Sequence, residues 1–264
     1  MAFFRGLLRN FGGIAVVLVL LLAVTFLPPD TSLSEVRAAA TLKACVPPAY
    51  PPLVTGDPER PGIDIELLRE VAGRIGVSLV LSENRAMGRD FNPRNWGLNR
   101  AQCQVIAGGV VNSVQTRSFL ETGPPYADTG WAIISPVPLT SLAGLDVGAL
   151  VLVSGLDRIG LSRFLRAEGA TARVLTTSDA LVLAISAGTL DAGVTEAMLA
   201  TKLAEENGWT VQWTPPELGR YQLVFGLWKG DMTLKGAIDR AFAELSADGT
   251  IAAILDRYGA APID

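Results

Sequence analysis

A glycine pair followed by an arginine is the group of residues in this chain best suited to bind a small anion. The segment 103–126 reads C-Q-V-I-A-G-G-V-V-N-S-V-Q-T-R-S-F-L-E-T-G-P-P-Y, a short apolar strand that stops at Gly108 and Gly109. Glycine has no Cβ, so a ligand can approach its backbone closely. Arg117 follows in a polar loop, and a guanidinium holds a carboxylate through two parallel hydrogen bonds. The pattern favours holding a small anion over transforming it.

The overall composition excludes several classes of protein. The 264 residues include no histidine, which removes the commonest metal ligand and the commonest general base. Only two cysteines are present, too few by themselves for a structural zinc site. The net charge is −4 and no basic block occurs, which argues against a nucleic-acid partner. We therefore expect no metal, no cofactor and no histidine-dependent catalytic triad.

The first 40 residues have the pattern of an export leader. Arg5 and Arg9 precede an apolar run over 11–27, and the Ala-Ala-Ala sequence at 38–40 offers a small-residue cleavage site. The spacer between the run and this site is long for a signal peptide, so an uncleaved membrane anchor is the alternative. Both interpretations place the domain outside the cytoplasm, in the periplasm, because arginines before the apolar run keep that end inside.

The two cysteines, Cys45 and Cys103, allow two interpretations. In an exported chain they can form a disulfide. They can equally remain as buried thiols that pack as small hydrophobic groups. The sequence leaves both open, because the close Cα approach that a disulfide requires is not visible in it.

The periodicity of apolar residues predicts strands that alternate with helices. In the helix expected at 63–75, Leu67, Leu68, Val71 and Ile75 share one face, and Gly76 ends it. The other expected helices are 156–168, 179–187 with Ser178 as cap, 198–207, 234–245 and 250–258. The expected strands are 41–46, 77–82, 104–107, 131–135, 149–153, 173–176, 191–195, 210–213 and 221–228. Alternation of this kind predicts an α/β fold with mostly parallel sheets.

Two proline-punctuated segments, 126–135 and 215–221, are the expected crossings between two lobes. They divide the chain into a leader at 1–40, a first lobe made of 41–130 and 220–264, and a second lobe at 131–219. The chain is long enough to give each lobe a core of its own.

Several motifs in order resemble one family, the extracellular solute-binding proteins of the polar-amino-acid class, which are partners of ABC importers. The motifs are L-K-A-C-V-P-P-A-Y-P-P-L, P-G-I-D-I-E-L-L-R-E-V-A, V-I-A-G-G, G-P-P-Y-A-D-T-G-W-A-I, V-S-G-L-D, L-D-A-G-V-T-E and the C-terminal L-S-A-D-G-T-I-A-A-I-L-D-R-Y-G. They cover nearly the whole chain after the leader. The resemblance implies a type II periplasmic-binding-protein fold with two lobes. Gln104 and Glu196 depart from it, because the family has aspartate at both positions.

The resemblance also implies a ligand site between the lobes. Arg117 would hold the ligand carboxylate, and Glu196 would accept its amino group. The remaining expected contacts are Tyr50 as an apolar wall, the backbone of Gly108, Gly109 and Val111, the Ser113 hydroxyl, and Ser154 with Gly155 at a helix start that accepts anions.

Each of these residues also has a purely structural interpretation. Arg117 can pair with Glu121 on the surface, and Glu196 can be an exposed residue that starts the next helix. Ser154 with Gly155 can be an ordinary helix cap. Ser113 can satisfy its own loop, and Tyr50 can be a plain loop aromatic.

The function expected from this resemblance is capture of a small zwitterionic or anionic solute by a monomer that closes by a hinge and docks on an ABC permease. Two alternatives stay open. One is an enzyme, since cyclohexadienyl dehydratases are similar across the same fold and need a carboxyl group in the cleft. The other is a periplasmic accessory or sensor domain, as found with quinoprotein dehydrogenases and membrane-tethered receptors.

Overall fold

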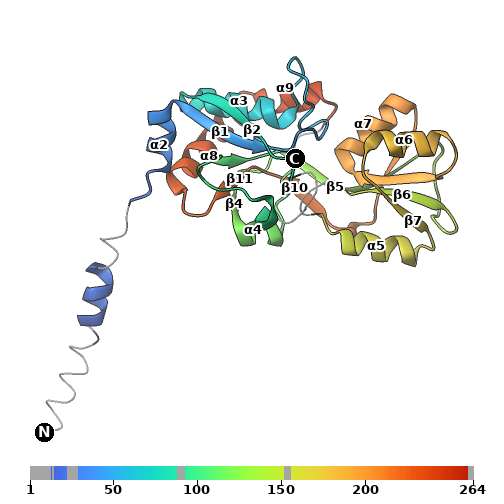
Figure 1. The fold of residues 1–264 in the computed structure, drawn as a ribbon, viewed down its shortest axis with the longest axis horizontal. Helices are drawn as coiled ribbons and strands as arrows, with labels where there is room; N and C mark the ends of the chain where they lie inside the picture. Colours follow the sequence, from blue (N-terminus) through green and yellow to red (C-terminus); the bar gives the residue numbers. More distant parts are fainter. Residues whose placement is uncertain (1–12, 14, 23–28, 88–92, 152–155, 261–264) are drawn as a thin grey trace, which may run out of the picture. The chain divides into compact units, whose positions relative to one another are not determined.

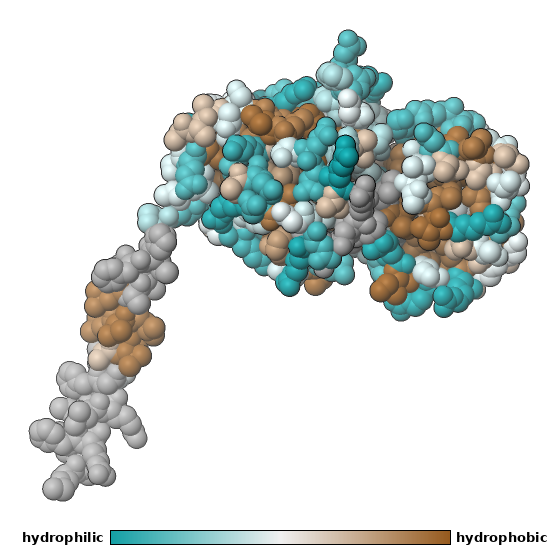
Figure 2. Space-filling model, in the orientation of Figure 1, coloured by the Kyte–Doolittle hydropathy of each residue, from teal (hydrophilic) through white to brown (hydrophobic). Residues whose placement is uncertain are grey.

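The computed structural model describes the chain apart from residues 1–12, 14, 23–28, 88–92, 152–155 and 261–264. It consists of two units, Met1–Thr31 and Ser32–Asp264. In the first unit, residues 15–22 are helical, and their large apolar side chains from Val16 to Leu22 are more than half exposed; this stretch is brown in Figure 2. Among the described residues, no helix has both the length and the apolar character needed to span a membrane.

The second unit opens with helix α2 (Ser32–Ala39), which the sequence pattern had assigned to the leader. Its Val36 side chain is 1% exposed and belongs to the main core. Ser32 Oγ lies 3.0 Å from Thr233 Oγ1 and accepts a 3.2 Å hydrogen bond from the backbone N–H of Leu234. Both partners belong to helix α8 (Met232–Ala247). Helix α2 is thus packed into the folded unit.

The first sheet has five strands in the order β2-β1-β3-β11-β4. Strands β1, β2 and β3 are parallel to one another, whereas β11 is antiparallel to β3 and β4. Helices α3, α8 and α9 surround this sheet in Figure 1. The bounds are β1 (Thr41–Val46), β2 (Ser78–Glu83), β3 (Val105–Ile106), β4 (Leu120–Thr122), β11 (Gly226–Trp228), α3 (Ile63–Ile75), α4 (Val114–Phe119), α9 (Thr250–Arg257) and the 3-10 turn η1 (Pro93–Trp96).

Helix α3 has the bounds that its sequence predicts. Leu67, Leu68 and Val71 on its apolar face are fully buried. Gly76 ends the helix in the left-handed region at φ 86°, and its N–H donates to the carbonyls of Ala72 and Gly73. The apolar spacing and the terminal glycine therefore fixed this element locally.

The second sheet has the order β10-β5-β8-β6-β7, with β9 also paired to β5. Strands β6, β7 and β8 are parallel, and the pairings of β5 are all antiparallel. Helices α5, α6 and α7 accompany this sheet (Figure 1). The bounds are β5 (Ala127–Ser135), β6 (Asp146–Leu150), β7 (Thr171–Leu175), β8 (Ala192–Glu196), β9 (Thr210–Trp213), β10 (Arg220–Leu223), α5 (Arg158–Ala167), α6 (Ser178–Ser186), α7 (Ala197–Asn207) and the 3-10 turn η2 (Pro216–Leu218).

The α/β prediction with two lobes is confirmed, although the sheets contain more antiparallel pairing than expected because strands next to the crossings join them. The single strand predicted at 221–228 is wrong. It is divided into β10 in the second sheet and β11 in the first, so the chain returns to the first sheet between Leu223 and Gly226.

Three local predictions also need correction. Strand β6 lies at 146–150 rather than 149–153. The cap of α6 is Thr177, whose side chain accepts from the N–H of Ala180, and Ser178 is the first helical residue. The expected polar loop around Arg117 is instead the short helix α4. Ser113 caps it by accepting a hydrogen bond from the N–H of Thr116, a pattern that the sequence S-V-Q-T carries only weakly.

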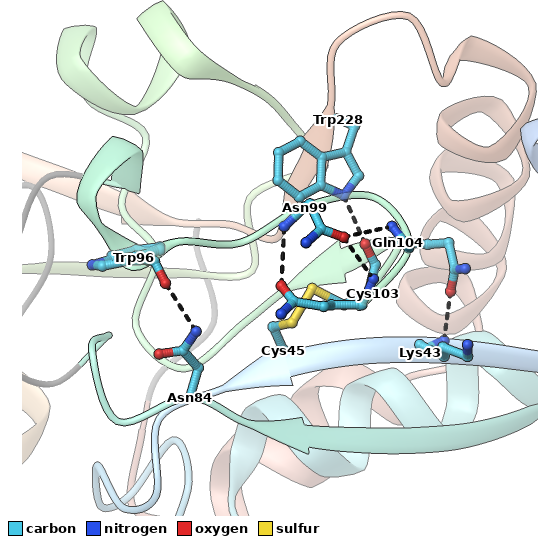
Figure 3. The surroundings of a disulfide bond; sticks show 10 residues. Lys43, Cys45, Asn84, Trp96, Asn99, Cys103, Gln104 and Trp228 are labelled. Atoms are coloured by element: carbon cyan, nitrogen blue, oxygen red, sulfur yellow. Dashed lines mark hydrogen bonds between the residues drawn. A yellow bond between two sulfur atoms is a disulfide. The ribbon is translucent and has the colours of Figure 1, made fainter.

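A disulfide joins Cys45 in β1 to Cys103 just before β3, with the two Cα atoms 5.5 Å apart (Figure 3). This settles the alternatives that the sequence left open. Around the bond, Trp228 Nε1 donates to the Cys103 carbonyl at 2.7 Å. Gln104 accepts from the N–H of Lys43 at 2.8 Å. The segment leading into β3 is thus attached to the first sheet by covalent and polar contacts.

Candidate functional site

Glu196 is the polar group around which the candidate site is built. It is the last residue of β8 and the cap of α7, and it is completely buried. Its carboxylate accepts hydrogen bonds from the N–H groups of Met198 and Leu199, both at 3.0 Å. Two hydroxyl groups, those of Thr129 and Tyr50, also donate to it. The sequence allowed Glu196 to be an exposed residue at the start of a helix. Its position at the helix start is confirmed, but its exposure is wrong, because the residue is completely buried.

The hydroxyl donors to Glu196 come from different parts of the fold. Thr129 lies in β5, whose residue Trp131 pairs directly with Glu196 in the second sheet. Tyr50 lies in the proline-rich loop after β1, which belongs to the first sheet. Its hydroxyl reaches Glu196 Oε2 at 3.4 Å, across 146 residues of sequence. This contact joins the two lobes.

Asp64 is a second buried carboxyl group near this contact. It is the second residue of α3 and is completely buried. Its Oδ2 accepts from the N–H groups of Gly108 at 2.6 Å and Gly109 at 3.3 Å, and its Oδ1 accepts from the Tyr126 hydroxyl at 2.5 Å. Asp64 therefore holds the glycine turn and the first crossing onto helix α3.

The glycine turn has the close backbone approach that its sequence predicts, but its neighbours are parts of the protein. Gly108 and Gly109 have φ values of 95° and 86°. A Cβ on Gly108 would lie 2.2 Å from Pro47 Cδ, and one on Gly109 would lie 3.2 Å from the Tyr50 ring. A side chain at Gly108 would overlap the proline-rich loop, and one at Gly109 would be tight against the Tyr50 ring, on a backbone conformation that L residues rarely adopt.

The two buried carboxyl groups, Asp64 and Glu196, differ from those of an ordinary ion-paired network in their pKa values and in their partners. Burial raises the pKa of Asp64 to about 6, and burial likewise raises the pKa of Glu196. The negative charge of Glu196 adds to the rise at Asp64. Among the ion pairs between described residues, none involves either carboxylate. Within the described part of the chain, the hydrogen-bond donors to the two acids are all neutral groups.

The predicted carboxylate-binding residues lie on and just before helix α4. Arg117 is exposed, and its guanidinium donates to the Asn112 side chain at 2.5 Å and the Asn112 carbonyl at 3.3 Å. Ser113 caps the helix, and Val111 forms an isolated bridge with Leu223. The hydrogen bonds of Arg117 to described residues thus stay within its own segment, and none of them reaches Glu121.

The remaining predicted residues, Ser154 and Gly155, lie outside the described part of the chain.

Two cavities lie elsewhere in the described structure. One of about 290 Å³ lies between the start of α7 and the end of α9, and one of about 200 Å³ lies beside the proline-rich loop. Neither is lined by a predicted ligand residue. Within the described residues, no cluster of acidic residues and cysteines has the composition of a metal site.

Sequence reasoning missed Asp64, Tyr126 and Thr129 as members of this cluster. Asp64 had a signal, because it lies between two isoleucines in I-D-I, where a buried acid is costly unless it has partners. Thr129 shares a strand face with Trp131, two residues further on. Tyr126 lies in the G-P-P-Y crossing, where only the fold shows which group its hydroxyl reaches.

Comparison with known proteins gives one family for nearly the whole chain. The family model for bacterial extracellular solute-binding proteins, family 3, matches residues 42–261. The chain is 23% identical over 260 residues to the L-cystine-binding protein TcyJ of Escherichia coli K12, covering 96% of this chain and 95% of that protein.

Solved structures show the same two-lobed fold. One is an ABC uptake transporter substrate-binding protein from Streptococcus pneumoniae with bound histidine. It has a TM-score of 0.70 and 17% identity, and the alignment covers 87% of this chain and 96% of that one. Another is an ancestral amino acid-binding protein described as a precursor of cyclohexadienyl dehydratase. Its TM-score is 0.66 with 16% identity, covering 86% and 98% of the two chains.

Proposed function

This chain belongs to the bacterial extracellular solute-binding proteins, family 3, and we propose that it captures a small zwitterionic or anionic solute, in the first place an amino acid. The chain matches the cystine-binding relative along almost its full length. In this role the protein would bind and release its solute without converting it.

The observation that carries the proposal is the buried Glu196 at the contact between the lobes. A buried carboxylate is costly to keep charged when only neutral groups face it. A ligand ammonium would supply the missing positive charge. Its hydrogen bond to the carboxylate would be stronger than one from a neutral donor. Glu196 is therefore the proposed acceptor of the amino group, the role that aspartate has in the family.

The carboxylate of the ligand is assigned to the first lobe. Arg117 would turn from Asn112 to hold it through two parallel bonds, with Ser113 and the Val111 backbone beside it. The N–H groups of Gly108 and Gly109 already donate to Asp64, so these glycines would not donate to the ligand. Their lack of a side chain would instead leave room for Tyr50 as the apolar wall of the site. Ser154 and Gly155 would approach from the second lobe.

Closure would occur about the two crossings, with the first sheet and its helices moving against the second sheet and its helices. The closed protein would then present both lobes to an ABC permease in the membrane. The arginine-led apolar leader supports a location outside the cytoplasm, as the family description does.

A thermal-shift screen of protein expressed from the full-length chain tests the proposal. Amino acids, polyamines and small organic acids form the panel. A ligand at a hundred times its dissociation constant adds about 2.7 kcal/mol to the stability of the folded state. We expect a hit among the amino acids that Arg117→Ala abolishes. A screen in which no ligand raises the melting temperature of well-folded protein would contradict the proposal and favour the accessory or sensor role.

An enzymatic role ranks below the accessory or sensor role but has one observation in its favour, because buried carboxyl groups with raised pKa values are also what a dehydration reaction uses as an acid. The similarity to a precursor of cyclohexadienyl dehydratase lies in the fold alone. Loss of water from prephenate or arogenate in the presence of the protein would establish this role, and we expect none.

A further inference from the structure

The hydrogen-bond acceptors of Glu196 are fully used. A carboxylate has two oxygens, each with about two acceptor positions. Oε1 accepts from Thr129 and the N–H of Met198, and Oε2 accepts from the N–H of Leu199 and the Tyr50 hydroxyl. Any further donor must displace one of these four.

The four donors are not equally replaceable. The two N–H groups belong to the first turn of α7 and are fixed by the helix. Thr129 is held in β5, which pairs with β8. The Tyr50 hydroxyl is the only one of the four that comes from the first lobe. At 3.4 Å its bond is longer than the 3.0 Å bonds of the two N–H groups, so it is the weakest of these and the one that lobe opening would break.

The first lobe holds the Tyr50 ring in a fixed position. The N–H of Leu53 donates to the Tyr50 carbonyl at 2.9 Å, and Tyr50 bridges Val54 across the turn. The ring packs on Gly109, where a Cβ would lie within 3.3 Å of two ring carbons. The hydroxyl is therefore brought to Glu196 by the packing of the proline-rich loop, with little freedom of its own.

From this arrangement we propose that the Tyr50 hydroxyl and the amino group of the ligand compete for Oε2 of Glu196. Tyr50 is then a latch between the lobes when no ligand is bound, and the ligand takes its place. The inference rests on the proposed function for the role of the ligand. An ammonium donor wins the exchange because its bond to the carboxylate is charge-assisted, whereas the hydroxyl is neutral.

The test is Tyr50→Phe, which keeps the ring on Gly109 and removes only the hydroxyl. Thr129→Val is the matched control, because it removes a donor from within the second lobe. Calorimetry with L-histidine, L-arginine and L-cystine is the first measurement, on protein expressed from the full-length chain. We expect Tyr50→Phe to bind its ligand about fivefold more tightly than the wild type, the equivalent of one neutral hydrogen bond. Unchanged or weaker binding overturns the latch.

A second measurement does not depend on any ligand. Small-angle X-ray scattering without ligand should give a larger radius of gyration for Tyr50→Phe than for the wild type and no change for Thr129→Val. Equal radii for Tyr50→Phe and the wild type overturn the latch. If the wild type gives no hit in the whole thermal-shift panel but Tyr50→Phe expands, the proposed amino-acid function fails, whereas the contact between Tyr50 and Glu196 is shown to hold the lobes together.

Discussion

Asp64 in the first lobe and Glu196 in the second are both completely buried carboxyl groups at the start of a helix, but the two groups are held differently. The partners of Asp64 are two N–H groups of the glycine turn and one tyrosine hydroxyl at the first crossing. Those of Glu196 are two helix N–H groups, a hydroxyl of its own sheet, and the hydroxyl of Tyr50 from the other lobe. Asp64 therefore fixes the architecture of the first lobe, whereas Glu196 has one partner that lobe motion can exchange.

The rest of the first lobe is consistent with this division. The Cys45–Cys103 bond and the packing of α2 on α8 both reinforce the first sheet. In the described residues of the second lobe, no disulfide or terminal helix has this role. The first lobe is therefore the more heavily cross-linked of the two, whereas the buried carboxyl group with an exchangeable partner lies in the second.

Removing the disulfide should have the largest effect on this comparison. The bond closes a separation of 58 residues, which corresponds to about 4 kcal/mol in the chain-entropy account. Replacing Cys45 and Cys103 together by serine should lower the melting temperature by about 10 °C. Scanning calorimetry measures this. Dithiothreitol should reproduce the loss in the wild type only, and a shift below about 2 °C would show that the first lobe does not depend on the bond.

The pH dependence of stability should reveal the charge on Asp64. Its folded pKa is about 6 against an ordinary value of 3.8, so the folded protein holds this proton more tightly than the unfolded chain does. Its contribution to stability is then fully present below about pH 4 and is lost as the pH rises through 6, a change of about 3 kcal/mol. Urea unfolding at pH 4 and pH 7.5 measures most of it.

Asp64→Asn is the control for this experiment, because it removes the titrating group and keeps one acceptor oxygen. The decline in stability with pH should become smaller in this variant, leaving the contribution of Glu196, whose pKa is shifted in the same direction. Identical pH profiles for the variant and the wild type would contradict a raised pKa at Asp64.

Removing helix α2 should lower the free energy of unfolding by somewhat less than removing the disulfide does. A chain that begins at Thr41 lacks Val36, which is 1% exposed, and the Ser32 contacts to α8. Compared with a chain that begins at Ser32, it should lose about 2–3 kcal/mol, mainly from apolar burial. Urea unfolding of both chains checks this, with the exposed Ala38→Ser change as a control within about 0.5 kcal/mol. Equal stability of the two chains would show that α2 does not stabilise the folded unit and belongs to the leader, as its sequence pattern predicted.

The smallest expected effect is that of Glu196→Gln, which tests whether Glu196 binds the ligand whereas Asp64 has a structural role. Glu196→Gln should weaken binding of an amino acid about 30-fold, because a charge-assisted bond contributes about 2 kcal/mol. Its melting temperature should change little, since the amide oxygen still accepts from the helix. Calorimetric titration of this variant and of Asp64→Asn makes the comparison. Equal losses of affinity in the two variants would show that the acids share one role.

Local features of the sequence were enough to predict much of the fold. Helix α3 has its predicted bounds because apolar spacing and Gly76 act within a few residues. Strands β1 and β9 likewise have the bounds that were predicted. The division of 221–228 between two sheets was missed, because a continuous run of strand-forming residues carries no sign of which sheet each half joins.

The candidate site was predictable only in part. Glu196 and Tyr50 were singled out through a resemblance, but nothing in the sequence indicates that they meet, since 146 residues separate them. The sequence by itself determined which chemical groups are present: no histidine, a glycine turn, and an acid at the start of a helix. The tertiary structure decided which groups share hydrogen bonds, because burial and long-range packing placed Asp64 on the glycine turn and Tyr50 on Glu196.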